Sequence, residues 1–134
     1  MKIYMAKEHP TKGTCWYVDL GDAPEHGDVL YKTRPCIIVS DNQYNRHSEC
    51  LTVVPVVSRT KKVRNTHAAI EESGIKGVAK AEQMRTISRS QLRGYKCTIS
   101  PETMQRVCKG IAYHLFSNDI HQENENKLVV ELAK

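Results

Sequence analysis

The apolar residues of this chain are gathered in short runs, rich in β-branched side chains, that glycine, proline or polar residues interrupt. Such runs occupy residues 14–20, 36–40 and 50–57, and shorter ones follow at 66–70 and 78–83. Because β-branched and aromatic residues favour strands and the intervening residues favour turns, each run predicts a short strand. None approaches the roughly 20 apolar residues that a membrane-spanning helix needs. The chain is therefore expected to form a small antiparallel sheet or barrel.

Some segments are less regular. Pro55 interrupts the run at 50–57, and because proline cannot donate to a ladder, this strand is expected at an edge or with a bulge. Gly74 and Gly77 are expected to break the chain before the strand at 78–83. Residues 41–49 read as a polar connection. The segments 86–92, 95–99 and 128–132 are ambiguous, although the second is more β-like.

One segment has the pattern of a helix. Ser100 is a good N-cap, Pro101 suits the first helical position, and Glu102 complements the helix dipole. Apolar side chains then recur at helical spacing: Met104, Val107, Cys108, Ile111, Ala112 and Leu115. This stripe predicts a helix near the C-terminus whose apolar face joins the core.

At 134 residues the chain is expected to hold one folded domain over 13–117, preceded by an arm at 1–12 and followed by an extension at 118–134. The N-terminus lacks the apolar stretch of a secretory signal, so the cytoplasm is the expected compartment. Five cysteines without a C-x-x-C spacing argue against a disulfide framework and a zinc site. Cys36 and Cys108 are expected to be small buried hydrophobes.

The net charge of +5 is unevenly spread, since the extension carries −2 and the first 117 residues carry +7. A basic body favours a polyanionic partner such as nucleic acid, although charge alone fits a solubilising surface equally well. The cations form a run and a looser series: Arg59, Lys61, Lys62 and Arg64, then Lys76, Lys80, Arg85, Arg89, Arg93 and Lys96.

Arg34 stands at the mouth of the predicted strand at 36–40. Pro35 has no backbone N–H and pushes the preceding residues away from helical geometry. A guanidinium held where a loop meets a rigid strand is well placed to bind a phosphate.

The sequence has no Gly-rich phosphate motif, no H-E-x-x-H, no G-x-S-x-G and no clear acidic metal cluster. Chemistry on nucleic acid would then proceed without metal, and RNA allows this because its own 2′-hydroxyl can attack the adjacent phosphate. That reaction needs a base, an acid and fixed positive charge. Strand alternation is expected to put Lys80 and Glu82 on one face of the sheet. There the two could serve as base and acid, or they could form a surface ion pair that contributes little to stability.

Several motifs occur together in an order that resembles the MazF/PemK (Kid) family of toxin endoribonucleases. They are Arg34-Pro35 with its apolar strand, the following Asn45, Val53-Val54-Pro55-Val56, and Glu82-Gln83-Met84-Arg85-Thr86-Ile87. Trp16-Tyr17-Val18-Asp19-Leu20 matches the opening strand of the family, and Thr66-His67 matches a T-H pair of some members. The resemblance covers roughly residues 13–117, and it rests on order and spacing rather than on any single motif.

The resemblance implies a mainly β fold, a small SH3-like antiparallel β-barrel of the CcdB/PemK type with a C-terminal α-helix, usually in a homodimer. It implies cleavage of single-stranded RNA, including mRNA, at short sequences without metal or another cofactor, leaving a cyclic phosphate and a 5′-hydroxyl. It also implies a cognate antitoxin whose acidic, flexible segment occupies the RNA groove. An acidic peptide competing with RNA for one basic surface is electrostatically reasonable.

Carried over by position, Arg34 matches the catalytic arginine of the family and Glu82 an acidic position that acts as base in some members. Lys80 stands where those members have arginine, which keeps the charge but loses the bidentate fork. The catalytic threonine of the family falls on Val57, so Ser58 is the nearest hydroxyl. Alternation points Val57 and Ser58 to opposite faces unless a bulge or strand end intervenes. The expected RNA-binding residues are His26, Arg59, Thr60, Lys61, Lys62, Gln83 and Arg85.

Two alternatives remain open on the sequence. The Val57 departure favours a module that binds RNA or another nucleic acid without cutting it. A gyrase-directed toxin of the CcdB type would use the same barrel.

The loop at 21–33 is longer than the family pattern. Its His26 is either a candidate for proton transfer or a solvated loop histidine.

Overall fold

The computed structural model describes residues 10–58 and 64–117. The strands are β1 (Thr14–Asp19), β2 (Thr33–Ile38), β3 (Cys50–Val57), β4 (His67–Glu72), β5 (Ile75–Lys80), β6 (Arg85–Ser88) and β7 (Leu92–Thr98). The helices are α1 (Asn42–His47) and α2 (Pro101–Phe116), with two short 3-10 turns, η2 (Ala81–Gln83) and η3 (Arg89–Gln91). None of the helices in these ranges is long and apolar enough to cross a membrane.

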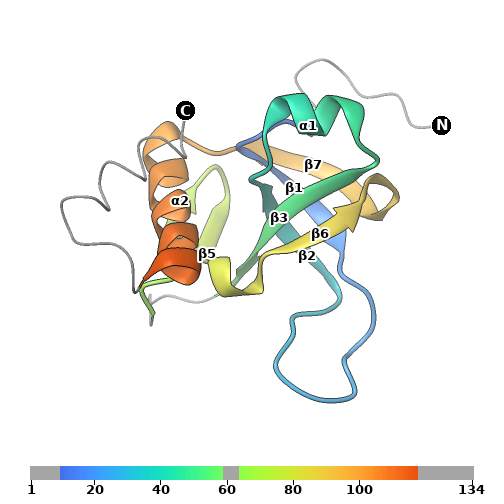
Figure 1. Ribbon diagram of the computed structural model, residues 1–134, viewed down its shortest axis with the longest axis horizontal. Coiled ribbons are helices and arrows are strands. Elements are labelled where there is room, and N and C mark those ends of the chain that lie inside the picture. Colours follow the sequence, from blue (N-terminus) through green and yellow to red (C-terminus); the bar gives the residue numbers. More distant parts are fainter. Residues whose placement is uncertain (1–9, 59–63, 118–134) are drawn as a thin grey trace.

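The strands form one curled antiparallel sheet with α2 packed beside it (Figure 1). Six of them follow the order β4-β5-β3-β2-β1-β7, and β6 pairs with the first half of β3. The mainly β fold with a C-terminal helix, predicted as a small SH3-like antiparallel barrel, is confirmed as a sheet curled into a half-barrel. The predicted arm and extension at 1–12 and 118–134 fall largely outside the described residues.

The core divides into two clusters because the strands alternate their side chains between the two faces of the sheet. On β2, Ile37 joins the cluster beneath α2, together with Val107 of that helix. Cys36 and Ile38 join the cluster inside the curl, where Trp16 packs. The five cysteines are free, and the predicted burial of Cys36 and Cys108 is confirmed.

The predicted start of α2 is also confirmed. The Ser100 hydroxyl accepts a hydrogen bond from the Thr103 N–H at 3.3 Å, and Pro101 occupies the first turn. A second group also caps this helix, the Glu72 carboxylate at the end of β4, and nothing in the sequence pattern predicts it. It accepts from the Ser100 N–H at 2.8 Å, and the hydroxyls of Ser100 and Thr103 also contact it. The helix is thereby fastened to the sheet at its first turn.

Replacing Glu72 with glutamine should destabilise the protein by about 1 kcal/mol at neutral pH. The hydrogen bond from Thr103, helped by those from Ser100, holds the pKa of Glu72 below its ordinary value of 4.5. Because its pKa is lower in the folded state than in the unfolded chain, Glu72 stabilises the fold at pH values above its ordinary pKa. This stabilisation is lost as the pH falls through the pKa of the folded state. Urea unfolding at pH 7 and at pH 3 should therefore show a difference between wild type and Glu72→Gln that shrinks in acid. A difference that grows in acid would contradict this role.

Two predicted boundaries are wrong for local reasons. The polar connection at 41–49 contains α1, which Asp41 caps by accepting from the Gln43 N–H at 2.9 Å. This helix is too short to show an apolar stripe. The buried Asn45 side chain fixes it to Ser40, with its Nδ2 donating to the Ser40 carbonyl at 2.9 Å. β2 begins at Thr33, so Arg34 and Pro35 lie within the strand rather than before it.

The expectation for Pro55 is also wrong, because β3 is central. One edge of β3 pairs with β2, and the other edge changes partner along its length. Residues 50–53 pair with β6, residues 56–57 pair with β5, and Pro55 lies where the partner changes. Neither β6 nor β5 pairs with residues 54 and 55. Proline is tolerated here because no hydrogen bond of either ladder needs its missing N–H.

The predicted strand at 78–83 is displaced. β5 begins at Ile75 and contains Gly77, and it ends at Lys80, where the chain enters the turn η2. Gly77 is required inside the strand because a Cβ there would lie 2.2 Å from the Val57 carbonyl oxygen. Lys80 and Glu82 therefore do not share the face of one strand, contrary to the prediction from alternation. The ambiguous segment 86–92 spans the end of β6, the turn η3 and the start of β7, and the segment 95–99 lies mainly in β7.

Candidate active site

The pairing between β2 and β3 ends early, and Arg34 lies just beyond this point. The ladder runs from Ile38 to the pair formed by Cys36 and Pro55. Continuing its register by two residues would set Arg34 opposite Val57. Pro35 and Pro55 have no N–H with which to extend the ladder. Arg34 is still fixed from the other side, where it pairs with Val18 of β1.

A second guanidinium approaches the same place. Arg34 and Arg85 both act electrostatically on the Cys36 thiol, which is buried in the curl of the sheet. Burial raises the pKa of Cys36 to about 12 despite the opposing effect of Arg85 and Arg34, so the thiol is neutral. Burial also lowers the pKa of Arg85. Arg34 and Arg85 also donate to the adjacent carbonyls of Tyr31 and Leu30, so the two cations lie near each other in a place suited to an anion.

The long loop between β1 and β2 is held down by Gln83 and Arg85. The Gln83 Oε1 accepts from the Leu30 N–H at 3.2 Å, and its Nε2 donates to the Asp28 carbonyl at 3.1 Å. Arg85 donates to the Leu30 carbonyl at 2.9 Å and to Gln83 Oε1 at 3.2 Å. Arg34 adds a bond from Nε to the Tyr31 carbonyl at 2.8 Å. Three of the expected site residues therefore hold one limb of this loop.

Replacing Gln83 with alanine should release that limb. The loss of one hydrogen bond, worth about 1 kcal/mol net, corresponds to roughly fivefold faster hydrogen exchange at the Leu30 amide. Exchange followed by NMR would measure it, with Gln105→Ala on the exposed face of α2 as the control. Equal exchange at Leu30 in the two variants would show that Gln83 does not restrain the loop.

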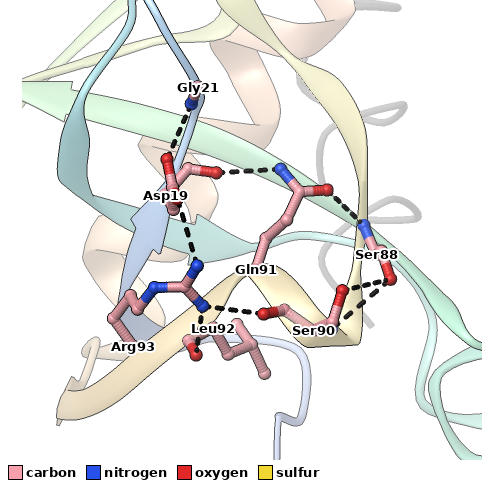
Figure 2. Close-up of polar contacts among 7 residues, drawn as sticks. All are labelled: Asp19, Gly21, Ser88, Ser90, Gln91, Leu92 and Arg93. Atoms are coloured by element: carbon pink, nitrogen blue, oxygen red, sulfur yellow. Dashed lines mark hydrogen bonds and ion pairs between the residues drawn. The ribbon is translucent and has the colours of Figure 1, made fainter.

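The base of the same loop is anchored separately. Figure 2 shows Asp19 between Gln91 and Arg93: the Gln91 Nε2 donates to the Asp19 carbonyl at 2.8 Å, and Arg93 meets its carboxylate at 3.1 Å. The backbone of Leu20 and Lys32 closes the neck, with N to O at 2.8 Å. His26 is exposed between these anchored ends.

Glu82 lies in η2 and is bonded to the start of β4. The Thr66 hydroxyl donates to its Oε1 at 2.9 Å, and the His67 Nε2 lies 2.8 Å from its Oε2. Burial by itself would raise the pKa of Glu82, but hydrogen bonds from His67, from its own backbone and from Thr66 outweigh burial and lower it. The sequence singled out Thr66 and His67 as a motif but did not connect them to Glu82.

Lys80 and Ser58 occupy the ends of two neighbouring strands. Lys80 is the last residue of β5 and pairs across the ladder with His67. Within the described ranges, no ion pair joins Lys80 to Glu82, whose ionic partner is His67. β3 ends at Val57, which is 9% exposed, and Ser58 follows as an exposed residue. The predicted RNA-binding residues Arg59, Thr60, Lys61 and Lys62 lie outside the described residues.

Comparisons with known proteins agree with this architecture. A family model for the PemK-like, MazF-like toxin of type II toxin-antitoxin systems matches residues 11–115. The endoribonuclease PemK of Escherichia coli is 29% identical over 113 residues, covering 81% of this chain and 84% of that protein. The endoribonuclease MazF4 of Mycobacterium tuberculosis is 24% identical over 103 residues, covering 77% and 90%.

Two solved structures share the fold. A mycobacterial endoribonuclease in complex with its cognate antitoxin has a TM-score of 0.67 and 27% identity, covering 79% of this chain and 94% of that one. MazF from Deinococcus radiodurans has a TM-score of 0.68 and 21% identity, covering 79% and 96%.

The curled antiparallel sheet with a helix packed against it is the fold of MazF from Deinococcus radiodurans and of the mycobacterial endoribonuclease. The chain belongs to the family of PemK-like, MazF-like toxins of type II toxin-antitoxin systems. The family resemblance carried by its motifs is thus confirmed.

Proposed function

We propose that this protein is the toxin of a type II toxin-antitoxin system and acts as a metal-independent endoribonuclease on single-stranded RNA. The observation that carries the proposal is that Arg34 and Arg85 meet near the Cys36 end of the β2–β3 ladder, where they donate to the adjacent carbonyls of Tyr31 and Leu30. The similarity to the endoribonucleases PemK and MazF4 supports the same activity. Cleavage of mRNA would place its action in the cytoplasm.

In the proposed reaction the RNA 2′-oxygen attacks the adjacent phosphorus, and the bond to the 5′-oxygen breaks. Glu82 takes the proton of the 2′-hydroxyl, since its lowered pKa keeps it ionised at neutral pH. Lys80 gives a proton to the departing 5′-oxygen, and Arg34 stabilises the negative charge that develops on the phosphoryl oxygens. The products are a 2′,3′-cyclic phosphate and a 5′-hydroxyl.

The remaining site residues would bind and position the RNA. Ser58 would supply the hydroxyl that Val57 lacks. Because β3 ends at Val57, the alternation of strand side chains does not force Ser58 to the face opposite Val57. Gln83 and Arg85 would exchange their contacts with the loop for contacts with RNA, joined by His26 and the basic run at 59–62. Base recognition would depend on how the loop rearranges.

The test is a digest of a long mixed-sequence RNA in the presence of EDTA. Discrete fragments carrying 5′-hydroxyl ends are the expected result, and mapping the cut sites would give the recognised sequence. Retention of RNA without cutting would instead identify a nucleic-acid-binding module, the alternative that Val57 favours. Inhibition of gyrase supercoiling without RNA cutting would identify a toxin of the CcdB type.

We also propose that the protein forms a homodimer and is inhibited by a cognate antitoxin with an acidic, flexible segment. Solved relatives in complex with antitoxins support such a partner. The segment would compete with RNA for Arg34 and Arg85 through complementary charge. A synthetic acidic peptide rich in Asp and Glu should inhibit cleavage, and the inhibition should weaken as salt rises.

A further inference from the structure

Glu82 is fastened to the start of β4 from two sides. Thr66 and His67, fifteen or more residues earlier in the chain, bond to its two carboxylate oxygens at 2.9 and 2.8 Å. The Ala81 N–H also donates to the Thr66 carbonyl at 3.2 Å, which ties the same turn to the same strand. The carboxylate therefore has a defined direction before any RNA binds.

His67 is enclosed, whereas Glu82 reaches the surface. The His67 side chain is 2% exposed and that of Glu82 is 23% exposed. Helix α2 packs closely behind this point, since a Cβ on Gly110 would lie 2.5 Å from the Thr66 carbonyl oxygen. RNA can thus contact Glu82 but not the imidazole, and any effect of His67 on cleavage must pass through Glu82.

Resting on the proposed function, we propose that His67 is a positioning residue for RNA cleavage, which orients the Glu82 carboxylate by a hydrogen bond from its Nε2. The arrangement is that of a surface base directed by a buried second group. Donation from Nε2 selects the imidazole state that carries a proton on that nitrogen. An ionised carboxylate has about four lone-pair sites, and His67, Thr66 and the Glu82 backbone use three of them, so the carboxylate can still accept a proton from substrate.

The elements packed against η2 are α2, β3 and β4, and β5 leads into it. Their charged and titratable residues are His67, Glu71 and Glu72 on β4, Lys76 and Lys80 on β5, Cys50 on β3, and Glu102, Arg106, Cys108, Lys109, Tyr113 and His114 on α2. Of these, His67 lies within 4.0 Å of the carboxylate as its ion-pair partner. Because the hydrogen bond from His67 lowers the pKa of Glu82, its removal should raise that pKa. The acid limb of the cleavage profile should then move to higher pH.

Two variants of His67 separate positioning from a general structural role. His67→Gln can keep a donor near the Nε2 position, whereas His67→Phe fills the buried space without one. For cleavage of a short RNA in EDTA, His67→Phe should lower kcat about tenfold or more, with KM little changed, since a general base contributes roughly 10²–10⁴-fold. The acid limb of the pH–rate profile of His67→Phe should move to higher pH. His67→Gln should recover both the kcat and the acid limb of the wild type.

Wild-type profiles in both variants would overturn the proposal. A loss of kcat in His67→Phe with an unmoved acid limb and no recovery in His67→Gln would also overturn it, because that pattern indicates a packing role alone.

A second measurement does not depend on catalysis or on the folding of His67→Phe. The His67 Nε2–H proton, observed by NMR, should exchange slowly with water in the wild type. It should exchange rapidly in Glu82→Ala and remain slow in Lys80→Ala, the matched change at the neighbouring cation. Slow exchange in Glu82→Ala would overturn the pairing. A wild type that fails to cut RNA but shows the protected proton would reject the proposed function and leave the pair established.

Discussion

Replacement of Arg34 by alanine should reduce RNA cleavage by roughly 10²–10³-fold while leaving the fold intact. This is the usual cost of removing one preorganised donor from the charge that develops in a transition state. The side chain makes one described hydrogen bond, from Nε to the Tyr31 carbonyl at 2.8 Å, and that bond restrains a loop rather than the core. Rates of cleavage in EDTA, with circular dichroism and melting as checks of the fold, would measure the effect.

Two further variants make this result specific. Arg34→Lys keeps the charge but loses the planar fork, so it should recover only part of the activity. Arg46→Ala removes the same charge from the exposed face of α1, beyond the opposite end of β2, and should cleave at close to the wild-type rate. Undiminished cutting by Arg34→Ala would reject the assignment of Arg34 to the reaction.

Replacement of Gly77 by alanine should destabilise the sheet strongly. The added Cβ would lie 2.2 Å from the Val57 carbonyl oxygen and 3.1 Å from its carbon, so β3 and β5 would have to separate. Gly→Ala exchanges often stabilise by about 0.4–1 kcal/mol through the unfolded state. Overpacking against backbone costs about 1–3 kcal/mol or more and should outweigh this gain.

Because Val57 ends β3 immediately before Ser58, the same change should also lower cleavage. Urea unfolding and RNA digestion would follow the two effects. The matched control is Lys76→Ala, at the preceding position of β5, which removes only an exposed pair with Glu71 at 3.9 Å. An unfolding midpoint for Gly77→Ala equal to that of the control would contradict the close approach of the two strands.

The correct predictions from sequence all rest on local signals. The strand at 14–20 follows from its β-branched and aromatic residues, and β1 confirms it at Thr14–Asp19. The start of α2 follows from Ser100 and Pro101, because capping is decided within one turn of chain. The helix α1 was not predicted, because a helix of six residues is too short to show an apolar stripe and so carries little local signal.

The candidate site was predicted residue by residue but not as an arrangement. The sequence singled out Arg34, Lys80, Glu82 and Arg85, yet their partners come from distant segments. Alternation paired Lys80 with Glu82, but the strand ends at Lys80 and the turn η2 points Glu82 at His67 instead. Hydrophobic periodicity does not predict the contact between Glu82 and His67, because the β4–β5 register and the packing of α2 bring these two residues together.

The sequence by itself determined the class of fold, the C-terminal helix, the basic character of the chain and its family, because each rests on composition, period or motif order. Only the tertiary structure decided that Arg34 and Arg85 approach one neutral thiol, that Gln83 fastens the loop, and that His67 holds Glu82. These contacts join residues far apart in the chain. They exist because curling the sheet and ending its ladders at Pro55 and Lys80 bring those residues within hydrogen-bonding distance or electrostatic range.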